Sequence, residues 1–199
     1  GSISFNGAVS MVDEDYYFAW ADDGDLVDTS STTDSIKFRG FVDGSWSDII
    51  LLDSNYGNSN IILSDPLIEA SENFVVVTWN KNEYPGDEEI VATYSTDNGD
   101  SWSSPEAIDP AYNHFIIYDY TGIVSPDGDF HVVWSGVKDS SDNYYNIFYQ
   151  KSEDGGQTWG DEVLISDSDS ENSLSPAISL SGSNVHIVWE QYYSSQSYY

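Results

Sequence analysis

Carboxylates are the most abundant groups in this sequence that could do chemistry. The chain carries 35 Asp and Glu residues against 5 Lys and Arg, with 3 His and no Cys, so disulfides and thiolate metal sites are excluded. Carboxylate oxygens are hard ligands that suit Ca²⁺, the only cofactor that the sequence suggests. Two acidic segments have metal character, although neither matches an EF-hand loop. Their candidate ligands are Asp22, Asp23, Asp25, Asp167, Asp169 and Glu171.

Paired carboxylates can also hydrolyse a glycosidic bond, one as a general acid and the other as a base or nucleophile. In this chain acidic residues are scattered through the loops. Any two acidic loops therefore offer a pair, and the sequence singles out none of them. We assign no catalytic residue from the sequence.

The formal net charge of −30 restricts the partners of the chain. Nucleic acid and anionic lipid surfaces are bound through Lys and Arg, so neither is an expected partner. Three explanations of the charge stay open: halophilic adaptation, a calcium-rich extracellular setting, and an ordinary acidic secreted surface. No apolar stretch is long enough for membrane insertion. We expect an extracellular or cell-surface protein whose export signal is not in this chain.

The seven tryptophans indicate which elements must position any site. Four of them close short apolar runs at intervals of 59, 55 and 55 residues (79−20, 134−79 and 189−134): Trp20, Trp79, Trp134 and Trp189. A second series interleaves with the first: Trp46, Trp102 and Trp159. Between them the sequence shows strand-like alternation and no helical periodicity. A repeat of about 55 residues built from four short strands predicts tandem propeller blades.

We therefore expect an all-β protein, a single β-propeller domain over residues 1–199 with about four antiparallel four-stranded blades. The blades are predicted at 8–52, 65–108, 118–165 and 176–199. The last blade lacks its outer strand, which residues 3–5 could supply to close the ring. A fragment of a six- to eight-bladed propeller and a ring formed by two chains remain open alternatives. An unclosed ring would leave an edge for self-association.

Two turns share the pattern S-x-D-x-G-x-[ST]-W, at 95–102 and 152–159, and residues 41–46 are a degenerate copy. In this motif the chain resembles the Asp-box, or bacterial neuraminidase repeat, propellers, whose superfamily includes the sialidases. The aspartate can accept backbone N–H groups within the turn, and the glycine permits a left-handed backbone. The resemblance implies scaffolding turns opposite the ligand face, built from Ser95, Asp97, Gly99, Trp102, Ser152, Asp154, Gly156, Thr158 and Trp159.

Sialidase activity is nevertheless not expected. Sialidases of the fold that the chain resembles bind the substrate carboxylate with three arginines, because the guanidinium fork pairs well with a carboxylate. This chain has a single arginine, Arg39, on a predicted strand next to the degenerate turn. The negative net charge would also repel an anionic sugar.

The resemblance further implies that ligands bind where the loops joining second to third strands gather with the loops joining successive blades. These loops are long, acidic and rich in tyrosine. Such loops suit contacts with carbohydrate or protein. The candidate ligand-binding residues are His114, Tyr118, Tyr84, Asp87, Asp142 and Tyr144.

The leading hypothesis from the sequence is a non-catalytic extracellular binding or adhesion module that presents these loops to a glycan or a protein. One alternative is a carboxylate-dependent glycan hydrolase or lyase. The other is a structural repeat element of a larger surface protein or assembly. Whether the chain is an enzyme is left open, and the lack of an arginine cluster favours the non-catalytic hypothesis.

The charge explanations predict how the melting temperature responds to ions. Molar NaCl should raise it relative to low salt because screening relieves repulsion between carboxylates. Millimolar Ca²⁺ at fixed ionic strength should raise it only if carboxylates bind the ion specifically. Thermal melts in the three buffers measure both effects. A melting temperature that is the same in all three would exclude both halophilic adaptation and calcium stabilisation.

Overall fold

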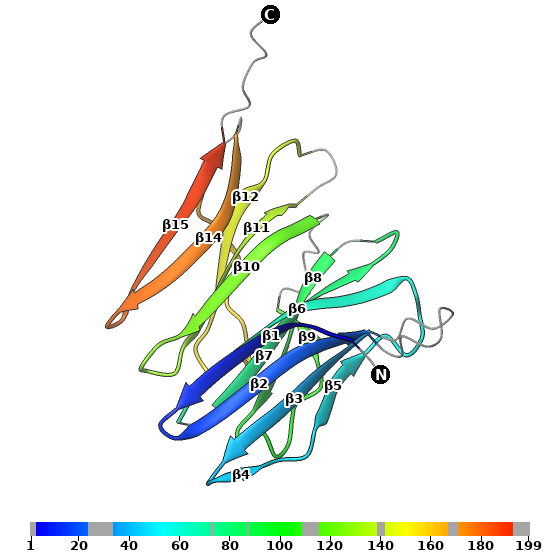
Figure 1. The fold of residues 1–199 in the computed structure, drawn as a ribbon. Coiled ribbons are helices and arrows are strands. Elements are labelled where there is room, and N and C mark those ends of the chain that lie inside the picture. The colour runs from blue at the N-terminus through cyan, green and yellow to red at the C-terminus, as the bar shows by residue number, and fades with distance from the viewer. Residues whose placement is uncertain are drawn as a thin grey trace, which may run out of the picture.

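The computed structural model describes residues 3–23, 34–72, 74–86, 88–108, 116–138, 142–166 and 171–192. The regular secondary structure in these ranges consists of β-strands alone. No helix long and apolar enough to cross a membrane is found in them. The strands form four antiparallel sheets, one after another along the chain, arranged as successive blades (Figure 1). The predicted all-β architecture of propeller blades is confirmed.

Each sheet is one blade, numbered here in chain order. Blade 1 contains β1 (Ile3–Val12), β2 (Asp15–Asp23), β3 (Asp34–Val42), β4 (Ser45–Trp46) and β5 (Ile50–Ser54). Blade 2 contains β6 (Ile61–Ser71), β7 (Phe74–Glu83), β8 (Glu88–Ser95) and β9 (Glu106–Ala107). Blade 3 contains β10 (Ile116–Val124), β11 (Phe130–Val137), β12 (Asn146–Ser152) and β13 (Val163–Leu164). Blade 4 contains β14 (Asn172–Ser181) and β15 (Asn184–Tyr192).

The start of the chain does not complete blade 4. Ile3 pairs with Asp23 and Phe5 pairs with Ala21, so residues 3–5 extend β1 along β2 within blade 1. The expectation that this segment supplies the outer strand of blade 4 and closes the ring is therefore wrong. The physical reason is that β1 keeps pairing with β2 on both sides of a one-residue bulge at Asn6, so residues 3–5 stay in the sheet of blade 1. The predicted blade 4 extends to residue 199, and residues 193–199 of it lie outside the described residues.

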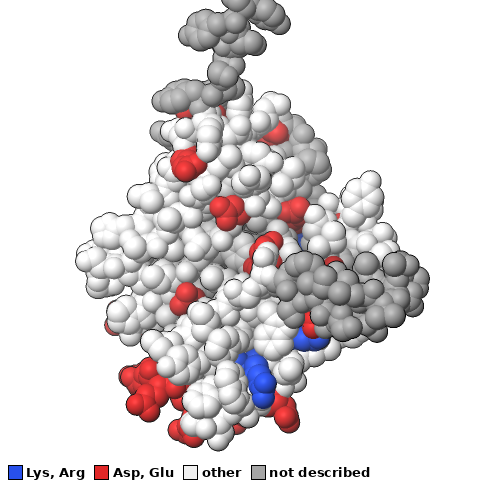
Figure 2. Space-filling model, viewed as in Figure 1, with Lys and Arg blue, Asp and Glu red and all other residues white. Residues whose placement is uncertain are grey.

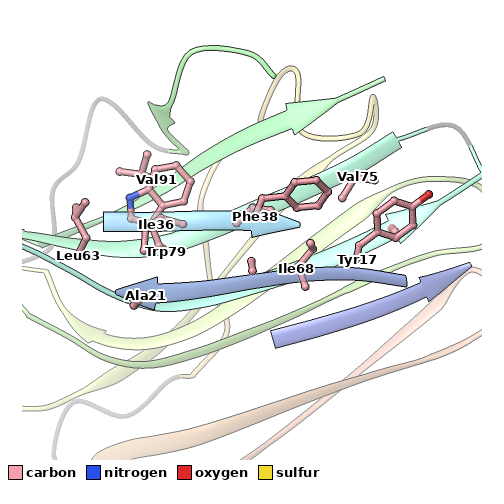
Figure 3. Close-up of a cluster of buried hydrophobic side chains, with 12 residues drawn as sticks. Tyr17, Ala21, Ile36, Phe38, Leu63, Ile68, Val75, Trp79 and Val91 are labelled. Carbon is pink, nitrogen blue, oxygen red and sulfur yellow. The ribbon is translucent and has the colours of Figure 1, made fainter. Parts of the chain in front are cut away.

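Neighbouring blades pack face to face, and their cores lie between the sheets. Strands such as β7 and β11 are rich in valine and aromatic residues, which favour a pleated, buried surface. One core joins blades 1 and 2 through residues such as Tyr17, Phe38 and Trp79 (Figure 3). A second core joins blades 2 and 3 through residues such as Val76 and Trp134. Since side chains alternate along a strand, blade 2 supplies one face to each core.

In blades 2 and 3, the tryptophans of both series pack toward the preceding blade. Trp79 of blade 2 lies in the core shared with blade 1, and Trp134 of blade 3 lies in the core shared with blade 2. Trp102 meets Phe38 of blade 1 edge to face, with ring centroids 4.7 Å apart. Trp159 packs against the core between blades 2 and 3. The period in the sequence thus reports one repeated contact between blades.

The inner strands are also joined by a repeated polar contact. The Oγ of Ser10 on β1 accepts the backbone N–H of Ala70 on β6 at 3.1 Å. At the same place on blade 2, the carboxyl of Glu69 accepts the backbone N–H of Val124 on β10. Side chains that satisfy a backbone donor of the next blade remove the cost of burying that donor. The contact therefore fixes the position of one blade along the next.

The turns at 95–102 and 152–159 have the same internal hydrogen bonds. Asp97 accepts from the backbone and hydroxyl of Ser101, and these bonds, with one from Ser95, lower its pKa. Burial acts to raise the pKa of Asp154, but matching bonds from Thr158 and Ser152 outweigh it. The glycines of these turns have positive φ and abut the preceding blade.

Gly99 should be more sensitive to substitution than Gly44. Both have positive φ, at 91° and 76°, so alanine strains the backbone at either position. A Cβ at Gly99 would lie 2.5 Å from Phe38 Cζ, whereas a Cβ at Gly44 would meet nothing within 4 Å. We expect Gly99→Ala to cost about 2–4 kcal/mol and Gly44→Ala about 1 kcal/mol in the free energy of unfolding. Urea melts of both variants measure the difference, and equal losses would contradict the packing argument.

Glu69 should make stability depend on pH. Burial raises its pKa to about 7 from the ordinary glutamate value of 4.5, although the bond from Val124 opposes the shift. The folded state therefore holds a proton that the unfolded state loses between these values, so stability falls as pH rises across that window. We expect Glu69→Gln to stabilise by about 1–3 kcal/mol at pH 8 and to have little effect at pH 4.5. Melts of both proteins at the two pH values test this, and a gain of equal size at both would contradict it.

Candidate functional site

The inner strands all carry a β-bulge near their first residues. The extra residues are Asn6 on β1, Asp65 on β6, Tyr118 on β10 and Ser175 on β14. Asn6, Asp65 and Ser175 also have positive φ, at 40°, 52° and 52°. A bulge breaks the alternation of a strand and redirects a side chain. The bulges therefore bring polar side chains to one end of the inner strands.

A cavity of about 290 Å³ lies where these ends of blades 1, 2 and 3 meet. We call it the axial pocket. Its polar and aromatic lining comes from β1, β6, β7 and β10: Asn6, Asp65, Asn80, Tyr118, Asp119 and Tyr120. The pocket thus gathers side chains that are far apart in the sequence.

Two carboxylates of the axial pocket differ in their surroundings. Burial is the main cause that raises the pKa of Asp119, and the negative charge of Asp65 adds to it. Asp65 Oδ1 accepts a hydrogen bond from Asn6 Nδ2 at 2.5 Å. A carboxyl with a raised pKa beside a hydrogen-bonded carboxylate is the arrangement expected of a general acid and its ionised partner.

Hydrogen bonds near the two carboxylates hold blades 2 and 3 together. The hydroxyl of Tyr120 lies within hydrogen-bonding distance of the carbonyl oxygens of Asp65 and Thr78. Burial raises the pKa of Tyr120, so its hydroxyl keeps its proton and remains a donor. Glu88 accepts from the backbone of Ile117 at 2.7 Å and from Asn80 at 3.4 Å. These contacts fix blade 3 against blade 2 on both sides of Asp119.

An exposed aromatic pair stands beside the axial pocket. Tyr118 is 61% exposed, and its ring meets Tyr145 edge to face with centroids 5.5 Å apart. Tyrosine rings offer an apolar face and a polar tip, as sugar-binding surfaces require. The pair therefore extends the polar pocket with a surface on which a ring could stack.

The structure brings together only some of the ligand-binding residues predicted from the sequence. Tyr118 lines the axial pocket, and Asp142 and Tyr144 lie just before its partner Tyr145. Tyr84 is exposed on the turn between β7 and β8 and does not line this pocket. His114 and Asp87 lie outside the described residues.

The metal-site prediction can be followed for only two side chains. Asp22 forms an ion pair with Lys37 on the neighbouring strand. Glu171 lies at the start of blade 4, and the side chains of Asp23, Asp25, Asp167 and Asp169 are outside the described set. Among the side chains that the structure describes, no group of three His, Asp or Glu could hold a metal ion.

Sequence reasoning missed four polar residues of the axial pocket: Asn6, Asp65, Asn80 and Asp119. A signal was present, because Asn-Gly at 6–7, Asp-Pro at 65–66 and Ser-Pro at 175–176 recur at one position of the repeat. Such dipeptides mark a break in a strand.

Comparison with known proteins identifies the fold. No protein-family model matches the sequence, and no curated protein matches it. A protein of unknown function from Dyadobacter fermentans has 14% identity and a TM-score of 0.66, with 96% of this chain and 63% of that chain covered. A family 117 glycoside hydrolase from the marine bacterium Zobellia galactanivorans has 9% identity and a TM-score of 0.57, with coverage of 95% and 66%.

Trypanosoma rangeli sialidase is also similar, at 15% identity and a TM-score of 0.61, with 94% of this chain and 34% of the sialidase covered. At these identities the similarity shows the fold alone, which is a propeller fold of the type seen in sialidases and glycoside hydrolases. The chain spans between about a third and two thirds of the length of these structures. It is therefore a partial propeller relative to them.

Proposed function

We propose that the chain acts on a neutral glycan and hydrolyses it at the axial pocket. The observation that carries this proposal is the meeting of Asp65 and Asp119 in one cavity, where burial and the charge of Asp65 raise the pKa of Asp119. The similarity to a glycoside hydrolase and a sialidase supports a glycan as the ligand. It favours the hydrolase alternative over the non-catalytic module that led the sequence analysis.

The two carboxylates would have different roles. Asp119, which keeps its proton to higher pH, donates it to the glycosidic oxygen as the bond to the leaving sugar breaks. Asp65, bonded to Asn6, takes a proton from the water whose oxygen attacks the anomeric carbon. Each turnover leaves Asp119 ionised and Asp65 protonated until they exchange protons with solvent. Tyr120 positions Asp65 through the backbone and takes no part in proton transfer.

The charge of the chain favours an uncharged substrate. Its single arginine, Arg39, is on β3 and does not line the axial pocket, so a carboxylated sugar finds no guanidinium there. The net charge of −30 repels anions. A neutral sugar can instead bond to the polar lining and stack on Tyr118 or Tyr145.

A non-catalytic glycan-binding module is the second candidate, and the exposed Tyr118–Tyr145 pair favours it. Both candidates use the same pocket and differ only in turnover. We also propose that the turns at 95–102 and 152–159 are Asp-boxes with a scaffolding role, and that the protein works outside the cell or on its surface. High salt or Ca²⁺ remain our proposals for the setting that its charge suits.

Turnover of neutral polysaccharides tests the proposal. We expect hydrolysis of at least one substrate in a screen, and Asp119→Asn should lower kcat by about 100-fold or more because the amide cannot donate the proton. Asp65→Asn should lower kcat similarly. Asp127→Asn is the matched control, because it removes the same charge from the exposed turn at the other end of β10.

Binding measured on the same variants separates the two candidates. An Asp119→Asn protein that binds the glycan like the wild type without hydrolysing it would support catalysis at this residue. Binding by the wild type with no turnover of any neutral glycan would support the non-catalytic module. Equal losses in the Asp119 and Asp127 variants, or no glycan binding at all, would overturn the assignment of the axial pocket.

A further inference from the structure

Blade 1 has one sheet face that no other described blade covers. Cross-strand pairs place Val9 beside Phe18 and Met11 beside Tyr16, and Tyr16 pairs with Phe41, which pairs with Trp46. Val9, Met11 and Trp46 are 59%, 60% and 54% exposed. We call this surface the open face of blade 1. Figure 2 shows the surface over β1 to β5 as mostly uncharged, with cationic atoms on it and acidic atoms at its lower rim.

The repeat shows what kind of surface fits the open face. Trp20 and Trp46 occupy the places of Trp79 and Trp102, which both pack against blade 1. In blade 3 the equivalent tryptophans pack toward blade 2. The open face of blade 1 therefore corresponds to the face that packs against the preceding blade in blades 2 and 3. An exposed aromatic surface of this kind is typical of an interaction site.

Blade 4 displays a surface of the complementary kind. Ala177 and Ser179 on β14 stand at the places of Ala8 and Ser10 on β1, which face blade 2. Val188 pairs with Ala177 and is 66% exposed. We call this surface the open face of blade 4. It is the side that elsewhere receives the following blade, and within the described residues no strand lies on it.

The two open faces also match in polar detail. Ser10 Oγ accepts the N–H of Ala70, and Glu69 does the same for Val124. Ser179 is the equivalent acceptor on blade 4, and it is exposed. The equivalent donor on the open face of blade 1 is the backbone N–H of Met11. Arg39 lies on the open face of blade 1, with its guanidinium 5.0 Å from the centre of the Trp46 ring, and blade 4 offers Glu190.

We propose that a second copy of this chain covers the open face of blade 1 with its own blade 4, so that copies associate head to tail. Ser179 of one copy then accepts the backbone N–H of Met11 of the other. The contact repeats the junctions between blades 1 and 2 and between blades 2 and 3, with an apolar centre and one fixed hydrogen bond. It also adds blades around the inner strands, beyond those that line the axial pocket in one copy.

The net charge predicts how this association responds to salt. Two copies of the chain, each with a net charge of −30, repel each other at low ionic strength, and salt screens that repulsion. The apolar contact itself is not weakened by salt. We therefore expect association of the wild type to strengthen from 50 mM to 1 M NaCl, read as mass by sedimentation or light scattering over a range of protein concentrations.

Paired variants test the head-to-tail geometry. Met11→Glu places a charge on the open face of blade 1, and Val188→Glu places one on the open face of blade 4. Each alone should weaken self-association by about 10-fold or more, because a buried carboxylate would be unpaired. Tyr56→Glu adds the same charge on a loop residue that is 85% exposed and should leave association unchanged.

Mixing the two variants distinguishes head-to-tail contact from contact between like faces. The Met11→Glu chain keeps an intact blade 4, and the Val188→Glu chain keeps an intact blade 1. An equimolar mixture should therefore form one-to-one pairs and nothing larger. A wild type that stays monomeric at high concentration and 1 M NaCl, a Val188→Glu variant that associates like the wild type, or a mixture without pairs would each overturn the proposal. Circular dichroism melts confirm that each variant is folded.

Discussion

The packing of one sheet face onto the next is the interaction on which the rest of this structure depends. A four-stranded sheet of this length has two faces, and each must be covered to bury its apolar side chains. Trp79 and Trp134 fill the space toward the preceding blade, and Gly99 lets a tight turn approach Phe38 closely. Polar contacts such as Ser10 to Ala70 then fix the sheets along each other. The fold is thus one junction repeated.

The candidate site depends on the same packing of neighbouring blades. The inner strands are held side by side, so a bulge in each can turn a polar side chain toward its neighbours without loss of the sheet. Asp65 and Asp119 come from different blades, and the charge of Asp65 raises the pKa of Asp119 only because the blades are packed. Tyr120 joins the two features, because its buried hydroxyl lies against the backbone at Asp65. Chemistry at this end therefore depends on the cores below it.

Much of the fold could be predicted from the sequence, and little of the site. The spacing of the indoles predicted the blades because tryptophans recur at the same places of the repeat, where those of blades 2 and 3 pack toward the preceding blade. The assignment of residues 3–5 to blade 4 was wrong. A short strand in the sequence does not indicate which strand it pairs with, and in the structure Ile3 pairs with Asp23 of blade 1. Tyr118 was found from its place in a connecting loop, but Asp65 and Asp119 were not. Their orientation arises from bulges, which shift a side chain by one place and escape a search for alternation.

The small number of Lys and Arg residues affects how susceptible this chain is to proteolysis. All five Lys and Arg residues lie in the described part of the structure, and Lys37, Arg39, Lys81 and Lys151 are within strands. Lys81 and Lys151 are held in ion pairs with Glu89 and Asp129. Enzymes that cut after a basic residue need an extended, accessible segment, and such segments are found mainly at loop tips. The fifth, Lys138, follows β11 and is paired with Glu162, so the folded chain offers trypsin-like enzymes few accessible bonds to cut.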